Sequence, residues 1–223
     1  PKGTTGGLDT VAVRYPNHPI AQALIKAAGV SIAAPSANLS GKPSPTLGEH
    51  VIDDMDGRID MIIDGGMVGM GLESTIIDVT VNPPMILRPG FITYEMVKEI
   101  VPDATEDRTI FTKPTKEFKP KAPGMKYRHY APKADLTLVE GETEAVVETI
   151  NRLAGEKLAE GRKVGIICTD ETKDRYPAGM LESIGARARQ ETVAHNLYAV
   201  LRDFDDRGAE YIFSEGFSED NLG

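Results

Sequence analysis

Hydrophobic positions in the second half of the chain alternate between strand and helix periods. Short apolar runs at 136–139, 163–169 and 210–213 have the length of strands. The middle run is apolar almost throughout, which is typical of a strand buried in a parallel sheet. Residues 143–158 and 192–207 repeat apolar side chains at helical spacing. This β-α-β order predicts a small parallel sheet with helices on its faces.

The first half mixes the same patterns at shorter spacing, which indicates a mixed α/β unit. The predicted strands are 10–14, 30–33, 60–64, 73–79 and 85–88. A helix is predicted after Asn17, with Ile20 and Leu24 buried. Others should follow Thr46, where Thr46 and Glu49 form a capping box, and Thr93. In the helix after Thr93, the side chains expected to be buried are Met96, Val97 and Ile100.

Residues 103–134 separate the two patterned halves. The segment is rich in proline, lysine and arginine and shows little periodicity, so we expect an extended linker. Its stretch 122–132 also carries tyrosines and a histidine. It is either a tether whose aromatic rings pack on a neighbouring domain or a strap over a charged ligand. The expected domains are therefore 1–102 and 135–223, joined by the linker.

Composition narrows the function classes. The net charge of −9 and the pI of about 5.0 argue against a general nucleic-acid-binding surface. Cys168 is the only cysteine, which excludes an intrachain disulfide and a cysteine-built zinc site and fits a reducing cytoplasm. We expect Cys168 to pack in the core, with Thr169-Asp170 at the strand end as a weaker site candidate. No stretch has the length and apolarity of a membrane span.

The loop Ala34-Pro35-Ser36-Ala37-Asn38-Leu39-Ser40-Gly41-Lys42-Pro43-Ser44 is the strongest candidate for chemistry. It lies between a predicted strand and a predicted helix and is rich in small hydroxyls. Such a loop can present backbone N–H and Oγ atoms to phosphate or carboxylate oxygens, although an ordinary turn has the same composition. Upstream, Thr10 and Arg14 share one face of the predicted strand. Arg14 is either part of a site or a solvated surface charge.

Four motifs occur in one fixed order: the loop 34–44, the run Glu73-Ser74-Thr75-Ile76-Ile77-Asp78, Arg88-Pro89-Gly90 and the tyrosine- and histidine-containing linker. With Thr10 and Arg14, this set resembles the YrdC-like family, specifically the two-domain L-threonylcarbamoyladenylate synthases. The resemblance implies a YrdC-like mixed twisted sheet with helices, joined by the linker to a small Rossmann-like parallel α/β domain. It also implies a nucleotidyltransferase that makes threonylcarbamoyl-AMP and pyrophosphate from L-threonine, bicarbonate and ATP, for threonylcarbamoyladenosine modification of tRNA.

The resemblance assigns site residues by motif. The implied ATP contacts are Thr10, Ser36, Ser44, Arg88 and Tyr127. The implied L-threonine contacts are Arg14, the Ala34 backbone and Ser74, while Asn38 and Ser40 shape the loop. Tyr127 and Tyr130 resemble residues that close over the nucleotide. No nucleophile, general base or metal-ligating side chain is assigned, because the reaction brings two anions together and chiefly needs positive charge and oriented donors. Mg²⁺ is expected with ATP.

The same resemblance sets expectations about partners and completeness. ATP, L-threonine and bicarbonate are the expected small-molecule partners, with other tRNA-threonylcarbamoylation proteins as candidate protein partners. We expect a cytoplasmic location, no membrane contact and no stable tRNA binding. Members of the family normally begin well before Thr10, with a Lys/Arg cluster, and continue past Gly223. We therefore expect weak or absent synthase activity from these residues alone, which a pyrophosphate-release assay tests.

Two other functions compete with the synthase. A YrdC-like module without synthase activity can bind double-stranded RNA on a concave basic surface, but the net charge of −9 counts against it. A carbamoyl-transferring relative used in hydrogenase maturation carries cysteine-rich zinc fingers, which a single cysteine cannot build.

Overall fold

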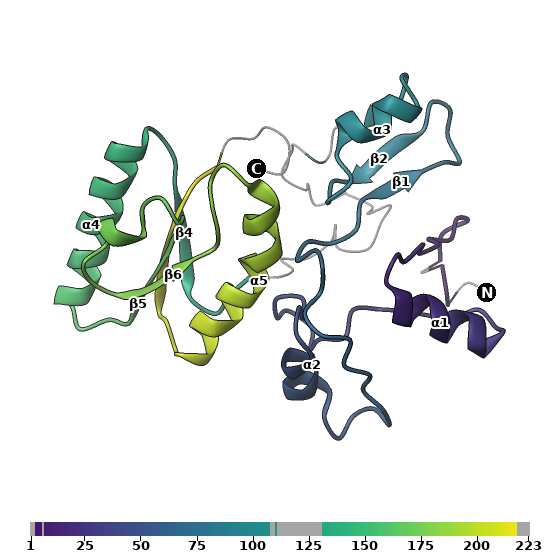
Figure 1. The fold of residues 1–223 in the computed structure, drawn as a ribbon, viewed down its shortest axis with the longest axis horizontal. Coiled ribbons are helices and arrows are strands. Elements are labelled where there is room, and N and C mark those ends of the chain that lie inside the picture. Colours follow the sequence, from purple (N-terminus) through teal and green to yellow (C-terminus); the bar gives the residue numbers. More distant parts are fainter. Residues whose placement is uncertain (1–2, 6, 108–109, 111–130, 218–223) are drawn as a thin grey trace.

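Two α/β units make up the part of the chain that the structure describes, residues 3–5, 7–107, 110 and 131–217 of a computed structural model (Figure 1). The first unit contains a mixed sheet of strands β1, β2 and β3, and the second an all-parallel sheet of β4 to β7. This confirms the predicted fold class. No helix in the described residues is long and apolar enough to cross a bilayer.

The second unit follows the predicted β-α-β order. Its elements are β4 (Asp135–Val139), α4 (Thr143–Ala159), β5 (Val164–Cys168), the 3₁₀ turn η2 (Lys173–Arg175), β6 (Met180–Ser183), α5 (Gln190–Asp206) and β7 (Tyr211–Glu215). The strands lie in the order β4-β7-β5-β6, all parallel. Thus β7 is inserted between the strands that begin the unit, and the buried run predicted around 163–169 becomes a central strand, β5.

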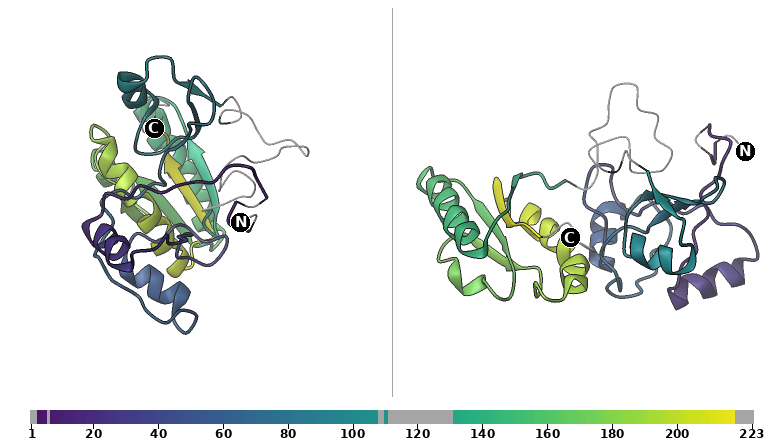
Figure 2. Two further views of the ribbon diagram at one scale, coloured as in Figure 1. Left: turned by 90° about the vertical axis from the view of Figure 1, so that its right-hand side faces the viewer. Right: turned by 90° about the horizontal axis from the view of Figure 1, so that it is seen from above.

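Each face of the parallel sheet is covered by one long helix (Figure 2). Alternate β5 side chains serve the two faces: Val164 and Ile166 pack with α4, and Ile167 packs with α5. Cys168 lies on the α4 side and is 1% exposed, which confirms its predicted core position. On the α5 side, a Cβ at Gly165 would lie 3.0 Å from the Phe204 ring, so the absence of a side chain lets this helix approach the strand.

The first unit has shorter elements and a smaller core. They are α1 (Pro19–Ala28), α2 (Gly48–Met55), β1 (Ile76–Asp78), β2 (Met85–Arg88), α3 (Tyr94–Ile100) and β3 (Thr105–Glu106). Strand β2 is central, antiparallel to β1 and parallel to β3. The core consists of Ile86, Val97 and Ala104. The Thr93 hydroxyl accepts a hydrogen bond from the Met96 amide and caps α3, as predicted.

Three predicted strands of the first unit were wrong. In the described residues, 10–14, 30–33 and 60–64 pair with no other strand. Their apolar side chains are exposed, with Val13 at 85% and Val30 at 68%. A period-two pattern becomes a strand only when a neighbour satisfies its backbone groups, and no described segment does so here.

The predicted helices form, but several of their details were wrong. His18, not Asn17, precedes the first turn of α1, and Ile20 and Leu24 are exposed. In α3 Val97 is buried, whereas Met96 and Ile100 are exposed. These helices are covered on less of their surface by described residues than their apolar stripes suggested.

The capping box before α2 also fails. Leu47 occupies the N-cap position, and the buried Thr46 hydroxyl has no hydrogen-bond partner in the described residues. The Thr46 amide instead donates to His50 Nδ1 at 3.2 Å, and its carbonyl accepts from the Val68 amide. The Thr46 backbone is therefore engaged by α2 and by a distant loop.

Candidate functional site

The loop 36–44 is folded on itself by its own amide side chain. Asn38 Nδ2 donates to the carbonyls of Leu39, at 3.0 Å, and Lys42, at 3.2 Å. The Lys42 amide donates back to the Leu39 carbonyl at 3.1 Å, and Gly41 adopts a φ of +93° at the bend. Asn38 was predicted to shape this loop, and its contacts are of that kind.

Asp54, from α2, lies beneath the loop and is 1% exposed. Its carboxylate accepts from the Leu39 amide at 3.3 Å and from Lys42 Nζ at 2.5 Å. A third donor is Arg202 Nη2 of α5, at 2.8 Å. Burial by itself raises the pKa of Asp54, but the hydrogen bonds from Arg202 and Lys42 outweigh it and lower the pKa to about 2. The carboxylate is therefore charged throughout the physiological range.

Glu73 connects the end of the loop to the second unit. Ser44 Oγ donates to Glu73 Oε1 at 2.6 Å, and the Tyr198 hydroxyl of α5 donates to Glu73 Oε2 at 2.5 Å. Each oxygen of this carboxylate thus accepts a hydrogen bond from a hydroxyl group, one in the loop and the other in α5. In the sequence Glu73 is only the first residue of a motif, whereas the structure places it between a predicted ATP contact, Ser44, and α5.

Arg88, at the end of β2, is directed to the same motif. Its Nε and Nη2 both donate to the Ser74 carbonyl, at 3.1 and 2.8 Å. A Cβ at Gly90 would lie 2.3 Å from the Glu73 carbonyl oxygen, so the turn after Arg88 must be free of a side chain to approach this closely. The structure therefore brings Ser44, Ser74 and Arg88 together around Glu73.

The remaining predicted site residues divide into two groups. Thr10, Arg14, Ala34, Ser36 and Ser40 are exposed, and no side-chain hydrogen bond or ion pair to a described residue is recorded for them. Tyr127 and Tyr130 lie outside the described residues, as does most of the linker. The ligand roles of these residues, and the loop-shaping role of Ser40, stay predictions.

Sequence reasoning missed the residues that join the two units. Arg202 is 5% exposed, and Tyr198 is 8% exposed. A usable signal exists in α5, where His195, Tyr198 and Arg202 recur at helical spacing on one face. Polar residues at this spacing usually mark a solvated face, so the pattern alone does not indicate an interface. Asp54 and Glu73, their carboxylate partners, are remote in the sequence.

A separate hollow of about 390 Å³ lies between the units. It is lined by Gly69, Met70, Leu72, Phe91, Glu191, Thr192, Ala194, His195 and Asn196. None of the predicted ligand contacts lines it, so it does not define the candidate site. Within the described residues, no group of three or more His, Cys, Asp or Glu side chains could hold a metal ion.

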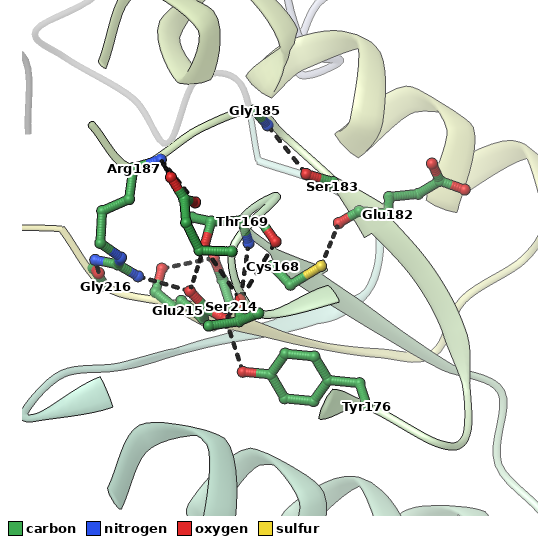
Figure 3. A network of polar contacts seen from close by, with 12 residues as sticks. Cys168, Thr169, Tyr176, Glu182, Ser183, Gly185, Arg187, Ser214, Glu215 and Gly216 are labelled. Atoms are coloured by element: carbon green, nitrogen blue, oxygen red, sulfur yellow. Dashed lines mark hydrogen bonds and ion pairs between the residues drawn. The ribbon is translucent and has the colours of Figure 1, made fainter. Parts of the chain in front are cut away.

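A second polar cluster lies at the carboxyl edge of the parallel sheet (Figure 3). Glu215, at the end of β7, is 1% exposed and accepts hydrogen bonds from Thr169, Thr172, Tyr176 and Arg187. Arg187 Nη1 also donates to the Gly216 carbonyl at 2.9 Å. The predicted candidate Thr169 is thus a buried partner of Glu215. Because four side chains of this chain already donate hydrogen bonds to the carboxylate, the cluster has a structural role at this edge of the sheet.

Comparison with known protein families gives a match to each half of the chain. The family described as "Threonylcarbamoyl-AMP synthase, C-terminal domain" matches residues 92–223, and one described as "Telomere recombination" matches residues 1–90. Proteins named threonylcarbamoyl-AMP synthase are similar over nearly the whole chain. The one from Bacillus subtilis is 46% identical over 98% of the chain, and the one from Pyrococcus abyssi is 44% identical over 100%.

Solved structures give the same result. Pyrococcus abyssi Sua5 complexed with L-threonine superposes with a TM-score of 0.89 at 43% identity, covering 98% of this chain and 62% of that one. A variant of the same protein gives a TM-score of 0.91 at 43% identity, over 100% of this chain and 62% of that one. The chain spans about three fifths of the length of the relatives it matches, 61% for the Bacillus subtilis protein and 63% for the Pyrococcus abyssi protein.

Proposed function

The chain belongs to the family described as threonylcarbamoyl-AMP synthase, C-terminal domain, and we propose that it is part of an L-threonylcarbamoyladenylate synthase. The enzyme would convert L-threonine, bicarbonate and ATP into threonylcarbamoyl-AMP and pyrophosphate. The observation that carries this proposal is the 46% identity, over 98% of the chain, to a protein named for that activity. The hydrogen bond from Ser44 to Glu73 and the two from Arg88 to the Ser74 carbonyl support it from the geometry.

The chemistry explains which groups such a site needs. Threonine reacts with bicarbonate to give an N-carboxylated anion, with loss of one water molecule from the bicarbonate carbon. The new carboxylate oxygen then attacks the α-phosphorus of ATP as pyrophosphate leaves. Two anions must approach, so catalysis rests on positive charge and oriented donors. We assign Arg14 to the threonine carboxylate, to which a guanidinium can donate two parallel hydrogen bonds, and Arg88 to phosphate, to which it brings positive charge while its Nε and Nη2 hold the Ser74 carbonyl. The Ser36 and Ser44 hydroxyls would add donors to ATP from the loop.

Mg²⁺ fits this proposal as an ion carried by the nucleotide. Asp54 and Glu73 accept hydrogen bonds from the loop, and both are also engaged by donors from α5. The described residues therefore offer no protein-built cage, and Mg²⁺ commonly keeps water and phosphate oxygens as most of its ligands.

Threonylcarbamoyl-AMP is a labile mixed anhydride, so we propose that another tRNA-threonylcarbamoylation protein receives it and that the reaction is cytoplasmic, where ATP and tRNA are both present. No observation on the described residues supports binding of double-stranded RNA, and the net charge of −9 opposes it.

Substitution of Arg14 tests the assignment in the natural protein at full length. We expect Arg14→Ala to raise the KM for threonine by tenfold or more, through loss of a charged hydrogen-bond pair of about 1.5–3 kcal/mol, with a much smaller effect on the KM for ATP. Arg58→Ala, which removes an exposed arginine after α2, is the control. Product is measured as threonylcarbamoyl-AMP by chromatography together with released pyrophosphate. Absence of threonine-dependent product from the wild-type protein would refute the proposed function.

A further inference from the structure

Helix α5 makes contacts on two of its faces. Leu201 and Phe204 pack into the core of the second unit against the parallel sheet. His195, Tyr198 and Arg202 share another face at i, i+3 and i+7, and each of them contacts the first unit. In Figure 1 and in the right-hand view of Figure 2, α5 lies between its own sheet and the first unit. Helix α5 therefore links the parallel sheet of the second unit to the first unit.

Arg202 makes the most extensive of these contacts. Its Nε and Nη2 donate to the Pro43 carbonyl at 3.1 and 2.6 Å, and Nη2 also donates to Asp54 at 2.8 Å. The residue is 5% exposed, so the guanidinium is almost fully withdrawn from water. A buried guanidinium with several donors fixes both the distance and the orientation of the groups it holds.

Asp54 passes this constraint into the loop 36–44. The carboxylate that faces Arg202 also holds the Leu39 amide and Lys42 Nζ. Together, Arg202 and Asp54 therefore fix the loop backbone directly at Leu39 and Pro43, and the side chain of Lys42 between them. The hydroxyl-bearing residues predicted to contact ATP, Ser36 and Ser44, flank this fixed stretch.

Tyr198 provides a second, independent attachment. Its hydroxyl holds Glu73 Oε2 while Ser44 holds Glu73 Oε1. Close packing reinforces it, since a Cβ at Gly71 would lie 2.3 Å from the His195 carbonyl oxygen. The loop that carries Ser74 and the loop that carries Ser44 are thus both attached to α5.

We propose that Arg202 and Tyr198 of the second unit are positioning residues that hold the two substrate loops of the first unit in their reactive arrangement. The proposal rests on the proposed function, because it takes the loops to be the ATP and threonine contacts. Neither side chain touches substrate in this scheme. Their effect is to keep Ser44, Ser74 and Arg88 aligned, and misalignment of about 1 Å at such a site can cost up to about a hundredfold in rate.

The primary test compares Arg202→Met, Arg202→Lys and Arg207→Met in the full-length natural protein. Methionine removes the donors, and lysine keeps the charge without the fork. Arg207 is the control, because it follows α5 and its guanidinium pairs with Glu182 and Asp203 of its own unit. Amide hydrogen exchange of residues 38–44 reports the loop, and kcat and KM for ATP and threonine report the site.

We expect Arg202→Met to speed exchange of the loop amides about tenfold and to lower kcat/KM for ATP about tenfold or more. Arg202→Lys should give intermediate values, and Arg207→Met should stay within about twofold of wild type in both measurements. A folded Arg202→Met protein with wild-type kcat and KM values would overturn the proposal, as would unchanged loop exchange.

Tyr198→Phe is the second variant, in case Arg202→Met does not fold. It removes one hydroxyl and leaves the ring in place, and we expect kcat/KM to fall about threefold to tenfold with native circular dichroism. Wild-type kinetics in Tyr198→Phe would contradict the role of that residue. If the wild-type protein makes no product, the proposed function fails, and loop exchange alone then decides whether Arg202 braces the loop.

Discussion

Protonation of Asp54 should weaken the contact between the two units in acid. The ordinary carboxyl pKa of 3.8 falls to about 2 in the folded protein, because hydrogen bonds from Arg202 and Lys42 outweigh the opposing effect of burial. A carboxyl group whose pKa is lowered by folding stabilises the protein above its unfolded pKa and loses that contribution as the pH falls through the folded value. The stabilisation is therefore complete above about pH 5 and is lost progressively toward pH 2.

The size of this effect follows from the two pKa values. The difference between 3.8 and about 2 corresponds to about 2 kcal/mol of unfolding free energy at neutral pH. About 1 kcal/mol of this should disappear between pH 5 and pH 3. Asp54→Asn removes the titrating group, so its stability deficit relative to wild type should shrink by that amount over the same range.

Urea unfolding at several pH values between 3 and 7 measures the deficit. The chain contains no tryptophan, so far-UV circular dichroism is the suitable signal. Asp53→Asn, at the exposed neighbouring position in α2, controls for an amide at this end of the helix. A deficit for Asp54→Asn that stays constant within about 0.3 kcal/mol from pH 5 to pH 3 would refute the reasoning.

Three further outcomes test the packing. Phe204→Ala empties a site that is 0% exposed and should lower the unfolding free energy by about 3–5 kcal/mol in urea titrations. Gly71→Ala would place a Cβ 2.3 Å from the His195 carbonyl oxygen and should lower the melting temperature by several degrees, whereas Gly69→Ala, with no heavy atom within 4 Å of its Cβ, should not. Burial raises the pKa of the Cys168 thiol to about 12, so a disulfide reagent at pH 8 should label it only after unfolding in urea.

The second unit could be predicted from sequence because its signals are local. The apolar run of β5 needs two covered faces, and the helical stripes of α4 supply Val146, Val147 and Ile150 for one of them. The strand order could not be predicted, since nothing in the chain near β7 indicates that it enters between β4 and β5. Pairing of parallel strands is decided by contacts across the whole unit.

In the first unit, local sequence patterns do not suffice to predict the structure. Segment 10–14 has the alternation of a strand, yet its backbone pairs with no described neighbour, so the pattern alone does not produce one. The loop 34–44 was recognised by its composition, which is also local. Asp54 was not recognised, because its partner Arg202 is 148 residues away and a single carboxylate in a helix normally faces water.

The buried pair between Arg202 and Asp54 has a physical role that an apolar contact could not fill. A buried ion pair is often no more stabilising than a well-packed apolar contact of the same size, because both charges lose their water. Its advantage is direction: the guanidinium meets the Pro43 carbonyl and Asp54 together in only one register of α5 against the loop. Apolar surfaces can slide past one another at small cost, whereas sliding here would leave a buried charge without its partner. We therefore infer that this contact fixes the position of α5 relative to the loop. The proposed reaction requires such fixed positions of its two substrate loops.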